Sequence, residues 1–162
     1  MYVVQYYMNG WTEFDVAMPD IVYIDWQLRL LNYLSERGRE ILVKQHPNSE
    51  INMPDYFFED IGVKDIPGRF EDVYKKADII LTDYSGSTTF GTALKSNKPV
   101  ILVDFGYSIL RPEEEYTLKK ACYVIEGKFL EDNRADIDWE DLKRALDECY
   151  AQNDRVYINE TL

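Results

Sequence analysis

The stretch that decides the fold is Ile79-Ile80-Leu81-Thr82-Asp83-Tyr84-Ser85-Gly86-Ser87-Thr88-Thr89, in which three apolar residues lead into a mainly polar run. Apolar residues without polar alternation are typical of a parallel strand that is buried on both faces. The stretch Ile41-Leu42-Val43-Lys44-Gln45-His46-Pro47 repeats this arrangement. Both stretches therefore predict strands of a parallel sheet whose carboxyl ends carry polar loops.

Working outward, the remaining sequence alternates predicted strands and helices. The predicted strands are Tyr2–Met8, Ile41–Val43, Tyr56–Ile61, Ala77–Leu81, Pro99–Phe105 and, as the last one, Cys122–Ile125. The predicted helices are Ile21–Leu34, in which Ile21, Ile24, Leu28, Leu31 and Leu34 recur at helical spacing, then Arg69–Lys76, Phe90–Ser96, a helix from Pro112, and Trp139–Cys149. Asp20 and Asp138 are candidate helix caps, Gly38 is a helix stop, and Gly62–Gly68 is a predicted loop. This order predicts an α/β fold, a Rossmann-like three-layer doubly wound parallel sheet that spans residues 1–162 as a single domain.

Composition excludes several classes of protein. The chain has 162 residues with 46% apolar and 30% charged residues, which suits one globular domain. Its net charge of −12 disfavours nucleic acid and anionic membranes as partners, because both need a basic face. Two cysteines suggest neither a disulfide framework nor a zinc site. No apolar run reaches the roughly 20 residues of a membrane helix, and no signal peptide is recognisable, so we expect a cytoplasmic protein without a membrane span.

The polar run after Leu81 has the chemistry of a phosphate site. Its small and hydroxyl residues, Ser85, Gly86, Ser87, Thr88 and Thr89, lead into a predicted helix. Backbone N–H groups at a helix start and the hydroxyl groups can donate to phosphate oxygens, and glycine lets the backbone approach a ligand. The alternative is that serine and threonine simply cap the helix, but five such residues exceed what capping needs. We therefore predict phosphate binding here.

The polar end of the other strand supplies the chain's one histidine. His46 can donate to a phosphate oxygen whether it is neutral or charged. Alternation along the strand puts Lys44 on the same side, as a second candidate phosphate contact. Pro47 restricts His46 to extended geometry, so a purely structural turn is the alternative reading. Both strand ends should meet at one edge of the sheet, which favours a shared cleft.

Asp83 is expected to structure its loop rather than to touch phosphate, because a carboxylate is a poor neighbour for an anion. The prediction is an Asx-type role in which it accepts backbone N–H groups. Several familiar sites are absent from the sequence: there is no P-loop, no Gly-x-Gly-x-x-Gly fingerprint after the first strand, and no Gly-x-Ser-x-Gly elbow. No metal site is predicted.

With these residues in place, the chain resembles the C-terminal, donor-binding half of GT-B glycosyltransferases. It is most similar to the CDP-glycerol glycerophosphotransferases, the teichoic-acid polymerases, whose pattern joins Lys-x-His-Pro to Thr-Asp-Tyr-Ser-Ser. These motifs stand here as Lys44–Pro47 and Thr82–Gly86. The likeness covers roughly Val3 to Tyr150 in order of elements, while sharp motifs cover the two loops alone. Bacterial sialyltransferases carry related motifs.

The resemblance implies a function and roles for the loops. His46 would be the catalytic residue that contacts the donor diphosphate, while Ser85, Ser87 and Thr88 would bind its oxygens. The implied substrate is a nucleotide-activated sugar or polyol, with CDP as the favoured nucleotide and UDP as the alternative, and the family stabilises the leaving nucleotide without a metal or other cofactor. The implied process is synthesis of surface polysaccharide or a teichoic-type polymer, at the inner membrane face through the rest of the enzyme.

Two departures from the family matter. Many relatives have an acidic residue early in the helix after the serine loop, where this sequence has Phe90-Gly91-Thr92, so ribose binding and nucleotide identity stay open. A GT-B enzyme also has an N-terminal acceptor domain, for which this chain has no room. We therefore expect an excised domain or a half-enzyme that needs this domain in cis or in trans and turns over little alone. The alternatives are half of a nucleotide-sugar 2-epimerase and a non-catalytic nucleotide-binding or interaction domain.

Overall fold

The computed structural model describes residues 1–3, 18–45, 58, 60–107 and 111–160, with side chains described as far as residue 151. In this part of the chain seven strands form one sheet in the order β3-β2-β1-β4-β5-β6-β7. They are β1 (Tyr2–Val3), β2 (Ile41–Lys44), β3 (Val63–Asp65), β4 (Ile80–Thr82), β5 (Val100–Asp104), β6 (Tyr123–Phe129) and β7 (Ala135–Ile137). All neighbours pair in parallel except β6 and β7. The reversal of strand order beside β1 is that of a Rossmann-like sheet, so the predicted α/β fold class is confirmed.

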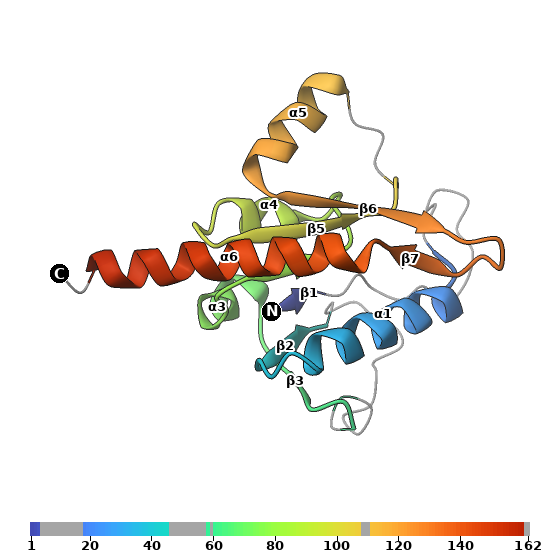
Figure 1. Ribbon diagram of the computed structural model, residues 1–162, viewed down its shortest axis with the longest axis horizontal. Helices are drawn as coiled ribbons and strands as arrows, with labels where there is room; N and C mark the ends of the chain where they lie inside the picture. The colour runs from blue at the N-terminus through green and yellow to red at the C-terminus, as the bar shows by residue number, and fades with distance from the viewer. Residues whose placement is uncertain (4–17, 46–57, 59, 108–110, 161–162) are drawn as a thin grey trace.

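Helices cover both faces of this sheet. They are α1 (Asp20–Ser35), α3 (Phe70–Val73) with the 3-10 turn η1 (Tyr74–Lys76), α4 (Thr88–Leu94), α5 (Pro112–Ala121) and α6 (Trp139–Glu160). In Figure 1 the strands rise from β3 to β6, α6 crosses in front of them, and α5 stands off at the β6 side.

Strand β5 shows why three layers form. Its side chains alternate between two apolar cores, as the pleat of a strand requires. Ile101 and Val103 join the core under α1 and α6, whereas Leu102 joins the core under α3 and α4. Because β5 is buried on both sides, it needs an unbroken apolar sequence, and the strand predicted at Pro99–Phe105 lies there.

Helix α1 forms where the sequence predicted it. Of the predicted apolar set, Leu31 is buried and Ile24 and Leu34 pack against the core, whereas Ile21 is 75% exposed. The inward face also includes Trp26 and Leu30, both fully buried, so the predicted spacing found the helix and part of its inward face. Asp20, the predicted cap, is the first helical residue, and the N-cap position is held by Pro19. Gly38 has φ of +67°, which suits the predicted helix stop.

The two edges of the sheet correct the predicted strands. Within Tyr56–Ile61, Phe58 is helical and residues 60–62 form a turn; the edge strand lies instead at Val63–Asp65, inside the predicted loop. At the other edge the predicted last strand, Cys122–Ile125, is followed by β7. Both missed strands are three residues long and pair on one side, so neither needs a long apolar run.

The other predicted elements begin within a few residues of the observed ones, although α6 continues past the predicted Cys149 to Glu160. Helix α4 begins two residues before the predicted Phe90. Asp138 caps α6, since its Oδ1 accepts the N–H of Glu140 at 2.9 Å. Of the predicted strand Tyr2–Met8, β1 covers Tyr2–Val3, and residues 4–8 lie outside the described residues.

Candidate functional site

The two predicted loops leave the sheet at the same level. Val3 of β1 pairs with Lys44 of β2 on one side and with Thr82 of β4 on the other. Since the backbones of neighbouring strands lie about 4.8 Å apart, the backbones of Lys44 and Thr82 are separated by about 10 Å, with β1 between them. Strand order reverses between β1 and β4, and ligands of such sheets bind outside the carboxyl ends at this reversal. The sequence prediction that both polar strand ends share one edge is therefore confirmed for their described parts.

The loop from Tyr84 to Ser87, which we call the serine loop, leads directly into α4. Ser87 is the N-cap, and its Oγ accepts the N–H of Phe90 at 3.0 Å. The simple capping role considered for this run therefore applies to Ser87, whose hydroxyl hydrogen can still donate. Thr88 is exposed and Thr89 half-buried in the first turn of the helix. The hydroxyl groups of the run thus stand on the solvent side of the carboxyl edge.

Gly86 lies against the end of the Tyr84 side chain. A Cβ atom at this position would lie 2.7 Å from Cζ and from the hydroxyl oxygen of Tyr84. The absence of a side chain therefore lets the Tyr84 ring fold over the loop, and any larger residue would require this ring to move.

Asp83 is the most deeply buried charged group at this edge, with 3% of its surface exposed. Its Oδ2 accepts hydrogen bonds from the Tyr2 hydroxyl at 2.5 Å and from the Trp26 indole nitrogen at 3.0 Å. Its Oδ1 accepts a hydrogen bond from the Tyr23 hydroxyl at 3.1 Å. The sequence predicted backbone N–H partners for Asp83, whereas the structure turns its carboxylate chiefly toward side chains of β1 and α1. Asp83 thus ties the start of the serine loop to two other elements.

Burial alters the acidity of this cluster. Desolvation raises the pKa of Asp83 from 3.8 to about 6, although the hydrogen bonds from Tyr2, Trp26 and Tyr23 act in the opposite direction. Burial and the charge of Asp83 also raise the pKa values of Tyr2 and Tyr107. Asp83 is therefore mainly ionised at pH 7 and becomes protonated in mild acid.

The sequence did not identify the aromatic residues as part of the site. Tyr23 and Trp26 are three residues apart on α1, so they lie on one helical face. Both side chains have an apolar body with a polar tip, and such a pair inside an apolar helix is a usable signal for a buried acceptor. The acceptor itself cannot be read from that spacing.

At the other strand end, Lys44 is 8% exposed, and its Nζ donates to the carbonyl oxygen of Gln45 at 2.5 Å. Gln45 in turn donates to Asp65 Oδ2 at 3.2 Å. The ammonium group is thus held at the carboxyl edge, on β2. His46 and Pro47 lie outside the described residues, so the roles assigned to them stay predictions.

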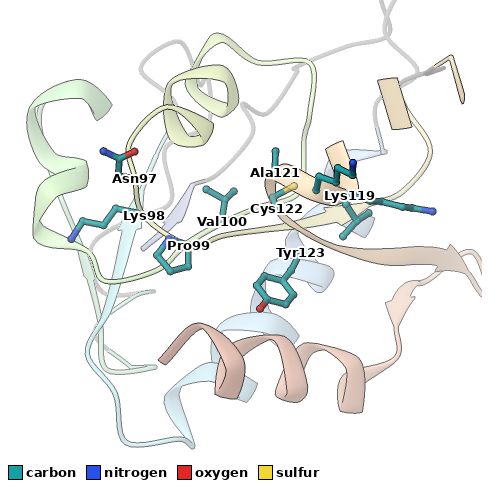
Figure 2. Close-up of a pocket in the computed structure, with 10 residues that line it drawn as sticks. Asn97, Lys98, Pro99, Val100, Lys119, Ala121, Cys122 and Tyr123 are labelled. Carbon is teal, nitrogen blue, oxygen red and sulfur yellow. The ribbon is translucent and has the colours of Figure 1, made fainter. Parts of the chain in front are cut away.

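A cavity of about 660 Å³ lies at the opposite, amino edge of the sheet, between the starts of β5 and β6 and the end of α5. Three lysines line it, but Lys119 pairs with Glu115 and Lys120 lies over a tyrosine ring. Figure 2 shows Lys98 and Lys119 on opposite sides, pointing away from each other. Burial raises the pKa of the Cys122 thiol to about 11, so it is a poor nucleophile at neutral pH. The described lining of this cavity therefore provides no set of polar side chains that point at a common ligand.

Other kinds of site leave no trace in the described part of the chain. No three His, Cys, Asp or Glu residues there are grouped so as to hold a metal ion. None of the helices formed by those residues has the length and apolar character needed to cross a membrane. Comparison with protein-family models, with curated protein sequences and with solved structures finds no match to this chain.

Proposed function

We propose that this chain is the donor-binding half of a GT-B-type transferase and grips the diphosphate of a nucleotide-activated sugar or polyol. The observation that carries the proposal is the register of Lys44, Val3 and Thr82, which brings two polar loops to one level where strand order reverses. An ammonium group on one side and hydroxyl groups on the other are the donors that phosphate oxygens require. Helix α4 has seven residues, so its dipole is a minor part of this argument.

In this proposal each loop has its own task. His46 contacts the diphosphate and supports the leaving nucleotide as charge develops on it, and Lys44 adds positive charge. The hydroxyl groups of Ser85, Ser87 and Thr88 donate to the remaining oxygens. Such a grip needs no metal ion, so binding should survive a chelator. The acceptor and the base that activates it would come from a second domain, and the transfer would serve synthesis of a surface polysaccharide or teichoic-type polymer.

The test is isothermal titration calorimetry of the chain with CDP, UDP, GDP and CMP in the presence of EDTA. We expect a nucleoside diphosphate, CDP above the others, to bind at least about tenfold more tightly than CMP, because the second phosphate adds charge-assisted hydrogen bonds. If the folded chain binds none of the three diphosphates, the proposal is wrong.

Ser87→Asp separates binding from folding. Aspartate is as good an N-cap as serine, so α4 should keep its stability. Its negative charge would face the phosphate, and diphosphate binding should be lost. His46→Ala should weaken binding as well, whereas Lys98→Ala, at the amino edge, is the matched control and should leave it unchanged. An equal loss of diphosphate affinity in the Lys98 variant would contradict a site at the carboxyl edge and indicate one at the amino edge.

A further inference from the structure

The carboxylate of Asp83 joins three elements at one point. Asp83 itself follows β4 and directly precedes Tyr84, the first residue of the serine loop. Its hydrogen-bond donors come from β1, through Tyr2, and from α1, through Tyr23 and Trp26. These partners lie 81, 60 and 57 residues away in sequence. The residue that directly precedes the serine loop is thus held by side chains from distant parts of the fold and not by its neighbouring backbone alone.

The surroundings of Asp83 suit an ionised carboxylate. An ionised carboxylate accepts hydrogen bonds at both oxygens, whereas a protonated carboxyl group carries an O–H that must itself find an acceptor. Here three donors already point at the two oxygens. Hydrogen bonds to a charged acceptor are also about twice as strong as those between neutral groups. Ionisation therefore tightens the link between the loop and its two supports.

This ionisation has a cost in folding free energy. Among the described residues, the titratable side chains that interact with Asp83 are Tyr2, Tyr23 and Tyr107, and none of them brings a positive charge. Desolvation of the carboxylate therefore outweighs its hydrogen bonds, as its raised pKa of about 6 reflects. A neutral residue would fold more favourably, so the charge calls for another explanation than stability.

We propose that Asp83 is the positioning residue of the phosphate grip: its ionised carboxylate, held by Tyr2, Tyr23 and Trp26, fixes the serine loop in the geometry that binds diphosphate. The inference rests on the proposed function of that loop. Asp83 acts through Tyr84–Ser87 and does not touch the ligand. Protonation of Asp83 weakens the three hydrogen bonds and loosens the loop, so diphosphate affinity follows the ionisation of this buried group.

The first variant is Asp83→Asn, which keeps the shape and removes the charge. The amide oxygen can accept from Tyr2 and Trp26 while the amide nitrogen donates to the Tyr23 hydroxyl, so the variant should fold. At pH 7.5 we expect it to bind CDP about tenfold more weakly than the parent chain, and at pH 5 the two proteins should bind alike. Ionisation of CDP itself affects binding to both proteins equally and therefore cancels in the ratio.

Amide hydrogen exchange gives a readout that needs no ligand. In the Asp83→Asn variant the amides of Tyr84, Ser85 and Gly86 should exchange faster than in the parent chain at pH 7.5. At pH 5 the difference should disappear, because Asp83 is then protonated in the parent chain too. Amides of β5 report on global unfolding, so in the variant they should exchange no faster than in the parent chain and separate the local change from the global one.

The second variant pair lies on α1. Tyr23→Phe removes the donor to Asp83 Oδ1, whereas Tyr33→Phe removes a donor to the carbonyl of Trp139, at 2.8 Å. Tyr23→Phe should weaken CDP binding about threefold and speed exchange in the serine loop, while Tyr33→Phe should lower thermal stability alone. If Tyr23→Phe binds CDP as tightly as Tyr33→Phe and the parent chain do, Asp83 does not position the phosphate grip.

The two proposals fail in distinguishable ways. If the parent chain binds CDP and the Asp83→Asn variant binds it with the same affinity at both pH values, the positioning role is wrong and the proposed function stands. If the parent chain binds no diphosphate, the proposed function is wrong and so is a positioning role for phosphate. Loop exchange that depends on Asp83 would then remain as a structural property without that function.

Discussion

Strand β4 has an aspartate near each end, and the two have opposite surroundings. Asp78 precedes the strand at the amino edge and is exposed, whereas Asp83 follows it at the carboxyl edge and is 3% exposed. The amino edge holds the cavity of about 660 Å³, with lysines that diverge. The carboxyl edge holds a buried charge, a buried ammonium group and a run of hydroxyl groups. Among the described residues, the cavity at the amino edge lacks converging polar groups, whereas the polar groups of the proposed site gather at the carboxyl edge.

The largest expected effect is on stability, at the carboxyl edge. The pKa of Asp83 is about 6 in the folded chain against an ordinary 3.8. The favourable contribution of its protonation is complete below pH 3.8 and is lost as pH rises through 6. Asp83→Asn should therefore raise the free energy of unfolding by up to about 3 kcal/mol at pH 7.5, with no gain at pH 3.5. Urea denaturation across this range measures it.

Asp78→Asn is the matched change at the other end of the strand. Asp78 is exposed and its charge acts on the buried amino group of Met1, so its substitution should change the free energy of unfolding by about 1 kcal/mol or less. Equal pH dependence in both variants would mean that burial of Asp83 does not distinguish the two edges.

The next effect compares two lysines. Lys44, at the carboxyl edge, supplies a held ammonium group, and Lys98 lies at the amino edge. Lys44→Met should weaken CDP binding about tenfold and reduce its dependence on salt, because one charged contact is lost. Lys98→Met should leave both quantities unchanged. Calorimetric titrations with CDP at two salt concentrations show which edge of the sheet holds the site. A larger loss of CDP affinity in Lys98→Met than in Lys44→Met would indicate the amino edge.

The smallest effect concerns two local backbone devices. Ser87 caps α4, and Asn97 adopts φ of +58° in the turn that follows the same helix. Either one changed to alanine should lower the free energy of unfolding by about 1 kcal/mol. Ser87→Ala should also weaken CDP binding, whereas Asn97→Ala should leave it alone. Similar stability losses with similar affinity losses would indicate that the loop responds to general destabilisation.

The sequence predicted those features that depend on local pattern. Strand β4 is buried on both faces and β2 nearly so, and the apolar runs Ile79–Leu81 and Ile41–Val43 therefore predicted these strands and the loops after them. Strands β3 and β7 pair on one side and were missed. The inward face of α1 was predicted only in part: Leu31 is buried as expected, whereas Tyr23 and Trp26 carry polar tips that need an acceptor from elsewhere in the fold.

The candidate site divides in the same way. The residue types of the serine loop and the edge on which it lies follow from the order of strands and helices. The partners of Asp83 come from separations of 57 to 81 residues, and pairing over such lengths depends on the tertiary arrangement alone. Its raised pKa of about 6 follows from burial, which no spacing in the sequence reveals.

The two short strands at the rims of the sheet have a consequence for the protein in concentrated solution. Val63–Asp65 and Ala135–Ile137 are only three residues long, and the carbonyl oxygen of Ala135 already accepts a hydrogen bond from Arg29. Long, flat rims are templates on which further chains add as strands, and short ones resist this. With a net charge of −12, molecules also repel one another at neutral pH. The architecture thus works against fibril-like association.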